Sequence, residues 1–125
     1  MATSPALEKI LAAKRADAYK DDKTLEELRG THKASGSAIP LPDGTTCETV
    51  DADGVDCEWI TATCKAPTPL SDACYFHVHG GGYYRGSSRV AAPVCSHIAG
   101  LAGIKCLSVN YRTAPEHKWP IGVDD

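Results

Sequence analysis

The spacing of apolar positions changes near residue 39 of the chain. Before that point apolar side chains recur three or four residues apart, as on one face of an amphipathic helix, and after it they gather in short runs that are typical of strands. Leu7, Ile10 and Leu11 have the helical spacing, and they predict a helix over residues 4–19.

A second, short helix is predicted to begin at Thr24. Thr24 and Glu27 have the spacing of a capping box, in which each residue satisfies a backbone N–H of the other. Gly30 is predicted to end this helix, because glycine is the commonest residue just past a helix C-terminus. Residues 31–40 show no periodicity, and we interpret them as a linker.

From residue 39 the pattern predicts strands. Residues 46–50 and 55–62 are separated by Asp51-Ala52-Asp53-Gly54, a combination typical of a β-hairpin connection. The two runs are therefore expected to pair as antiparallel strands. We divide the chain accordingly into an N-terminal helical segment, residues 1–38, and a strand-containing segment, residues 39–125.

A strand, a helix and a second strand follow in that order. Residues 73–79 and 104–109 are mostly apolar runs of strand length, and residues 87–102 between them have apolar positions at helical spacing. Such a βαβ unit places its two strands parallel to each other. The fold class is α/β, with a mixed sheet that is mostly parallel, has an antiparallel edge and is flanked by helices.

Three consecutive glycines follow the first of these buried strands, within the run His79-Gly80-Gly81-Gly82-Tyr83. Backbone without Cβ atoms can approach a small anion closely and turn its N–H groups toward it. This is the chemistry of an oxyanion hole, and HGGG is the form that it takes in lipases and esterases. A glycine triplet is also common in tight strand-to-helix turns, so the run needs a second motif beside it.

Composition excludes several function classes. The chain has 125 residues, a net charge of −3 and scattered arginines, which disfavours a nucleic-acid or anionic-membrane partner. The N-terminus has no signal-peptide pattern and no run approaches membrane-spanning length, so we expect a cytoplasmic protein without a membrane span.

The six cysteines are interpreted as reduced thiols. Cys74, Cys95 and Cys106 lie in apolar runs, where a free cysteine behaves as a small hydrophobic residue. The chain has no Cys-x-x-Cys pair, so neither a metal site nor a cofactor is expected.

The second motif is YRTAPEH at residues 111–117, followed by Pro120 and by Asp124-Asp125. With the glycine run, in this order and at this separation, the chain from residue 39 onward resembles the N-terminal portion of the hormone-sensitive-lipase-like carboxylesterases. The resemblance implies the N-terminal part of an α/β-hydrolase fold, preceded by cap-like helices that cover the acyl pocket.

The resemblance also implies roles for individual residues. Gly81 and Gly82 would donate backbone N–H groups to the oxyanion, supported by His79 and Gly80, which shape the turn. None of the catalytic triad can be placed: the chain contains no Gly-x-Ser-x-Gly motif, and the triad Asp and His follow the serine in such folds.

Other residues near the motifs are assigned more weakly. His79 has the residue type of a catalytic base, but the triad histidine of these folds comes last in chain order, so we assign it a structural role. Tyr83 and Tyr84 either line the mouth of the pocket or pack beside it. Arg112 and Glu116 are expected to brace the loop after the fourth strand.

Two classes of function follow from these motifs. The first is a serine carboxylic ester hydrolase acting on a small-molecule ester, with this chain supplying the oxyanion-hole loop and the rest of the sheet coming from a C-terminal segment or a second chain. The second is a non-catalytic, receptor-like member that binds a small molecule, as the gibberellin receptors of this fold do, and a truncated inactive fragment is a third reading.

Overall fold

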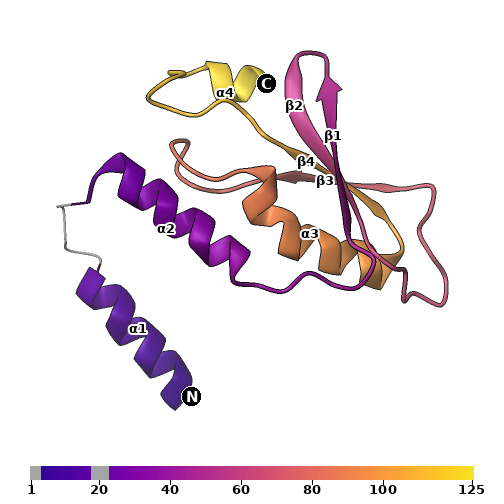
Figure 1. The fold of residues 1–125 in the computed structure, drawn as a ribbon, viewed down its shortest axis with the longest axis horizontal. Helices are drawn as coiled ribbons and strands as arrows, with labels where there is room; N and C mark the ends of the chain where they lie inside the picture. Colours follow the sequence, from indigo (N-terminus) through magenta and orange to yellow (C-terminus); the bar gives the residue numbers. More distant parts are fainter. Residues whose placement is uncertain (1–3, 18–22) are drawn as a thin grey trace.

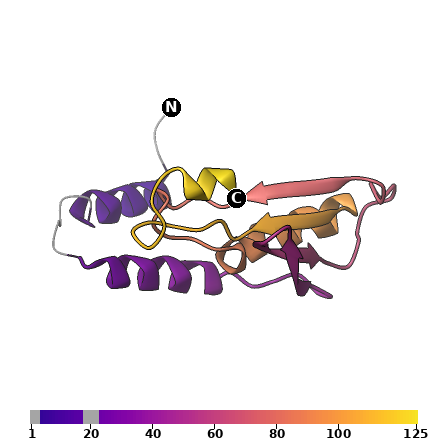
Figure 2. The same cartoon turned by 90° about the horizontal axis from the view of Figure 1, so that it is seen from above.

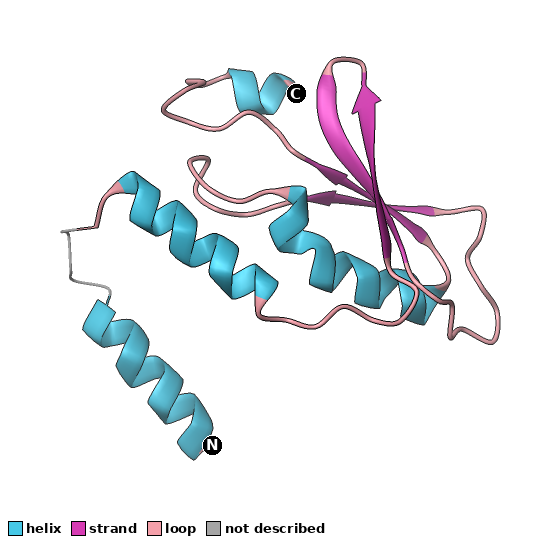
Figure 3. Cartoon of the chain, viewed as in Figure 1, coloured by secondary structure: helices cyan, strands magenta, loops and turns pink. Residues whose placement is uncertain are grey.

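The structure, a computed structural model, describes residues 4–17 and 23–125. Figure 1 and Figure 3 show its elements. In chain order these are α1 (Pro5–Asp17), α2 (Leu25–Ser37), β1 (Thr46–Ala52), β2 (Val55–Thr61), β3 (Cys74–Val78), α3 (Ser88–Ala102), β4 (Lys105–Val109) and α4 (Ile121–Asp124).

Helix α1 confirms the helix predicted from residue 4, and its predicted end at residues 18 and 19 lies outside the described residues. The Ser4 hydroxyl accepts a hydrogen bond from the Leu7 N–H at 3.2 Å, which caps the first turn. The helix lies apart from the sheet (Figure 1), and the side chains of Leu7 and Ile10 are 42% and 57% exposed. Its apolar face therefore has little cover in this chain.

Helix α2 begins as predicted but does not end where predicted. The Thr24 hydroxyl accepts from the Glu27 N–H at 3.2 Å, and the Glu27 carboxylate accepts from the Thr24 N–H at 2.7 Å. The prediction that Gly30 ends the helix and that residues 31–40 form a linker is wrong, since α2 continues to Ser37. The cause is tertiary: α2 packs on α3, and at Gly36 the two helices come so close that a Cβ would lie 2.9 Å from Val90.

The four strands form one sheet in the order β1-β2-β4-β3. The hairpin of β1 and β2 is antiparallel and β3 pairs with β4 in parallel, both as predicted. The prediction of a mostly parallel sheet is wrong for this chain, because β2 also pairs with β4 antiparallel. Among the described residues the βαβ unit supplies the one parallel pair, β3–β4, and the antiparallel pairs are β1–β2 within the hairpin and β2–β4 between the hairpin and this unit.

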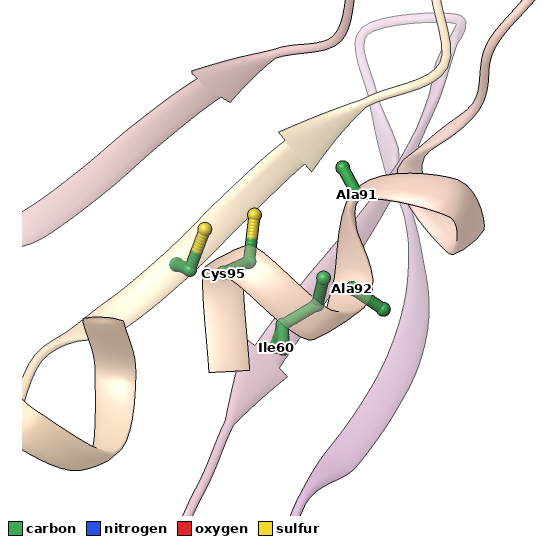
Figure 4. Close-up of a cluster of buried hydrophobic side chains, with 5 residues drawn as sticks. Ile60, Ala91, Ala92 and Cys95 are labelled. Carbon is green, nitrogen blue, oxygen red and sulfur yellow. The ribbon is translucent and has the colours of Figure 1, made fainter. Parts of the chain in front are cut away.

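Helix α3 covers one face of the sheet, and α2 packs on the outside of α3. The core beneath α3 consists of Ile60, Ala91, Ala92, Cys95 and Cys106 (Figure 4). Cys95 and Cys106 are fully buried, as expected, whereas Cys74 is exposed because it begins the edge strand β3.

The other face of the sheet is apolar and lacks a covering helix in the described part of the chain. Figure 2 shows β3 at the outer edge, with β4 beside it. Phe76 and Val78 of β3 remain 61% and 56% exposed on this side. An apolar edge strand of this kind ordinarily pairs with a further strand.

Candidate oxyanion site

The glycine run leaves β3 at the carboxyl end of the strand and turns sharply before α3. The turn is closed by the Gly81 carbonyl oxygen, which accepts hydrogen bonds from the N–H groups of Tyr84 at 3.4 Å and Arg85 at 3.3 Å. Gly81 and Gly82 have φ values of 142° and 64°, a region that side chains disfavour. A Cβ at Gly81 would lie 1.9 Å from the Arg85 carbonyl oxygen. The loop therefore requires glycine at this position.

The N–H groups of Gly81 and Gly82 have no hydrogen-bond acceptor among the described residues. Both residues line a cleft of about 520 Å³, a volume within the usual range for small-molecule sites. Unpaired backbone donors beside such a cleft are suited to binding the oxygen of a ligand. The structure thus brings together the two glycines that the sequence predicts as oxyanion donors.

The floor of the cleft is the uncovered face of the sheet. Phe76, Val78 and Val109 provide apolar walls, and Tyr83 lies at the rim, 61% exposed. Tyr84 is not among the lining residues. Of the two tyrosines predicted near the pocket, only Tyr83 lines it.

His79 is fixed within the fold. Its ring is only 6% exposed and stacks on Tyr111 with ring centroids 4.3 Å apart. The Tyr111 hydroxyl donates to the His79 carbonyl oxygen at 3.0 Å, and His79 Nδ1 lies 3.1 Å from the Gly80 carbonyl oxygen. Burial lowers the pKa of His79, so that its neutral form is favoured. These contacts suit a residue that holds the loop.

Sequence reasoning missed Arg29, which ties the glycine loop to the N-terminal helices. From α2 its guanidinium donates to the carbonyl oxygens of Tyr84 at 2.7 Å and Ala114 at 2.9 Å. It also forms a bidentate ion pair with the Glu116 carboxylate, in which both hydrogen bonds are 2.7 Å long. This pair lowers the pKa of Glu116 to about 2. No sequence motif includes Arg29. The sequence also predicts that its helix ends one residue later, at Gly30, so a contact with the glycine loop was not expected.

The loop after β4 is braced from the C-terminal side as well. Asp125 accepts hydrogen bonds from the Arg112 backbone N–H at 2.7 Å and from Arg112 Nε at 2.8 Å. Arg112 holds the pKa of the Asp125 carboxyl below its usual range. Arg112 and Glu116 therefore lie in bracing ion pairs, with Asp125 and with Arg29.

Asn110, at the end of β4, fixes the start of α3. Its side-chain oxygen accepts from the Ser88 N–H at 2.6 Å, and its amide donates to Asp56 at 3.1 Å. The buried Glu58 carboxylate accepts from the Ser88 hydroxyl at 2.7 Å and pairs with Arg89 at 2.6 Å. The helix that follows the glycine loop is thus anchored to β2.

The cleft has one carboxylate on its wall, that of Asp125. No serine, cysteine or lysine lines it. Among the described residues no cluster of His, Cys, Asp or Glu could hold a metal ion. Nor does any helix in residues 4–17 or 23–125 have the length and apolar character needed to cross a bilayer.

Sequence comparison assigns the class to which this fold and loop belong. Residues 75–125, from β3 through the bracing loop, match the family model of the α/β-hydrolase fold. The structure is similar over its whole length to an esterase of the bacterial hormone-sensitive-lipase family, with 36% identity, a TM-score of 0.79 and coverage of 41% of that chain. Residues 75–125 therefore carry the α/β-hydrolase family signature, and the chain corresponds to the N-terminal portion of hormone-sensitive-lipase-family esterases.

Two curated relatives match over 70% of this chain. One is a probable carboxylesterase 6 of Arabidopsis thaliana, 37% identical, of which 28% is covered. The other is a FAD-linked oxidoreductase, pytB, of Aspergillus terreus, 32% identical, of which 10% is covered. Because so little of the second protein is aligned, its name indicates nothing about the reaction of this chain. The chain spans well under half of each relative.

Proposed function

We propose that this chain provides the oxyanion hole of a serine carboxylic ester hydrolase that acts on small esters. The observation that carries the proposal is the pair of unpaired N–H groups at Gly81 and Gly82 beside an apolar cleft. Similarity to hormone-sensitive-lipase-family esterases supports the reaction class.

The glycine loop acts when the ester carbonyl is attacked. A serine outside this chain gives its hydroxyl proton to the triad histidine as its oxygen bonds to the carbonyl carbon, and breaking of the C=O π bond leaves the carbonyl oxygen as a negatively charged alkoxide. The N–H groups of Gly81 and Gly82 donate to this oxygen, and a third N–H comes from the residue after the serine. Donors fixed before the reaction stabilise the transition state without a cost of reorganisation.

The walls of the cleft suit the acyl part of the ester. Phe76 and Val78 stand beside the glycine loop, and neither carries a polar group that would need a partner. An acyl chain bound there would bury apolar surface that this chain leaves in water, at about 25 cal/mol per Å². His79 acts as a positioning residue through the contact of its Nδ1 with the Gly80 carbonyl oxygen.

The test is to complete the chain with the C-terminal segment of the hormone-sensitive-lipase-family esterase and to assay p-nitrophenyl esters. We expect hydrolysis by the completed chain and none above the imidazole background by the chain alone, which has no Gly-x-Ser-x-Gly serine. A covalent serine inhibitor establishes whether the serine of the completed chain is reactive. If it is reactive and the ester binds without turnover, the receptor-like function is favoured. Turnover by the chain alone would contradict the proposal that this chain supplies the oxyanion hole while the catalytic serine lies outside it.

A further inference from the structure

A second cavity, of about 430 Å³, lies between α2 and the start of α3. It shares no lining residue with the cleft beside the glycine loop. No Asp or Glu lines it, although the chain as a whole has a net charge of −3. Its walls carry four cationic side chains and one histidine: Arg29, His32, Lys33, Arg85 and Arg89. We call this cavity the cation pocket.

Two of the four cations have carboxylate partners outside the cation pocket. Arg29 pairs with Glu116, and Arg89 pairs with the buried Glu58. For Lys33 and Arg85 the structure records no ion pair with any described residue. Neither charge is therefore neutralised by a carboxylate, although the Arg85 guanidinium lies over the Tyr84 ring, 5.2 Å from its centroid.

Two polar atoms of the lining residues are buried without a hydrogen-bond partner. They are Nδ1 of His32 and Nε of Arg85. An orphaned buried polar atom costs free energy, and a bound water or ion is one way in which such an atom is satisfied. Because Arg85 Nε is a donor, the group that would satisfy it is an acceptor.

The start of α3 adds to the positive potential. Ser87 caps this helix of 15 residues and lines the cation pocket, as does Arg89 in the first turn. The Arg89 N–H has no acceptor among the described residues. Free N–H groups at the N-terminus of a long helix favour anions.

We propose that the cation pocket binds a phosphate group. Guanidinium groups match phosphate oxygens with paired hydrogen bonds, and lysine adds a mobile point charge. A doubly charged oxyanion would compensate both Lys33 and Arg85, which a carboxylate with one charge would not. The ligand is inorganic phosphate or the phosphate of a small phosphomonoester.

The test titrates sodium phosphate, and in a parallel arm glycerol phosphate, into the chain at constant ionic strength. Backbone amide resonances from α2 and from residues 85–90 are followed by NMR. We expect saturable shifts confined to these residues. Tighter binding of glycerol phosphate would assign the site to phosphomonoesters, and tighter binding of inorganic phosphate to the free ion.

A double variant tests the two uncompensated cations. Lys33→Gln with Arg85→Gln should weaken phosphate binding at least about tenfold. Lys33→Gln alone changes an exposed side chain and should weaken binding without disturbing the fold. The matched control is Lys65→Gln with Lys105→Gln, which removes the same charge from exposed residues near the other end of α3 and should leave binding unchanged.

Three results would overturn the proposal. One is a set of linear shifts that sodium chloride reproduces, and another is equal affinity in the double variant and its control. The third is loss of phosphate binding when the chain is completed with the C-terminal segment of the esterase, since that segment would then be the occupant of the cation pocket.

Discussion

A single methyl group at Gly81 tests the oxyanion-hole assignment directly. The Gly81→Ala change puts a Cβ 1.9 Å from the Arg85 carbonyl oxygen and 2.6 Å from its carbon. Both are backbone atoms, so no flexible side chain can move aside. The φ of 142° is itself disfavoured for alanine. The turn must therefore open or rotate, and the Gly81 N–H is displaced from its position beside the cleft.

The expected loss is that of one oxyanion donor. Removing such a donor lowers kcat by about 10² to 10³, or about 2.7–4 kcal/mol of transition-state stabilisation. The interaction is made with the charged oxygen of the transition state and hardly with the neutral ester. KM should consequently change little while kcat falls.

The assay compares p-nitrophenyl butyrate kinetics of the completed enzyme carrying Gly81→Ala or Gly80→Ala. Gly80 is the matched control, because a Cβ there meets nothing within 4 Å. Far-ultraviolet circular dichroism establishes that both variants are folded. If Gly81→Ala keeps a kcat close to that of Gly80→Ala, the loop is a structural turn and the oxyanion assignment is wrong.

Three further predictions concern the N-terminal helices. Gly30→Ala should stabilise the chain by about 0.5–1 kcal/mol in urea unfolding, since Gly30 lies inside α2 with open space around it, and destabilisation would argue against a continuous helix. The ion pair with Arg29 lowers the pKa of Glu116 from 4.5 to about 2. The stability that this pair contributes should therefore be fully present above pH 4.5 and be lost as the pH falls toward 2. Glu116→Gln should flatten that part of the pH profile, and an unchanged profile would show that the pair contributes nothing. Removing residues 1–23 from the completed enzyme should alter the preference among p-nitrophenyl esters of different chain length, and an identical preference would refute the cap assignment.

Local signals in the sequence were sufficient for most elements of the fold. The hairpin followed from Asp53-Gly54, whose two residues both have positive φ, at 58° and 89°. The βαβ unit followed from two apolar runs around a helix, and β3 and β4 are parallel as that unit requires. Each of these features is decided by residues close together in the chain.

The errors arose where distant residues decide the structure. Gly30 has the residue type of a helix end, but it lies within α2 because packing against α3 extends the helix. The pairing of β2 with β4 joins residues about 50 positions apart, such as Cys57 and Val109, and no local pattern encodes it. The cation pocket was missed for the same reason, since α2 and the start of α3 supply it together.

The same error explains why Arg29 was missed. Because α2 runs past Gly30 to Ser37, Arg29 lies inside the helix rather than one residue before its end. From there it reaches the carbonyl oxygens of Tyr84, at the end of the glycine turn, and of Ala114, in the bracing loop. The Ala114 N–H in turn donates to the Tyr83 carbonyl oxygen at 2.7 Å. The glycine loop is thus held by α2 from the N-terminal segment, so α2, the glycine loop and the bracing loop form one structural unit.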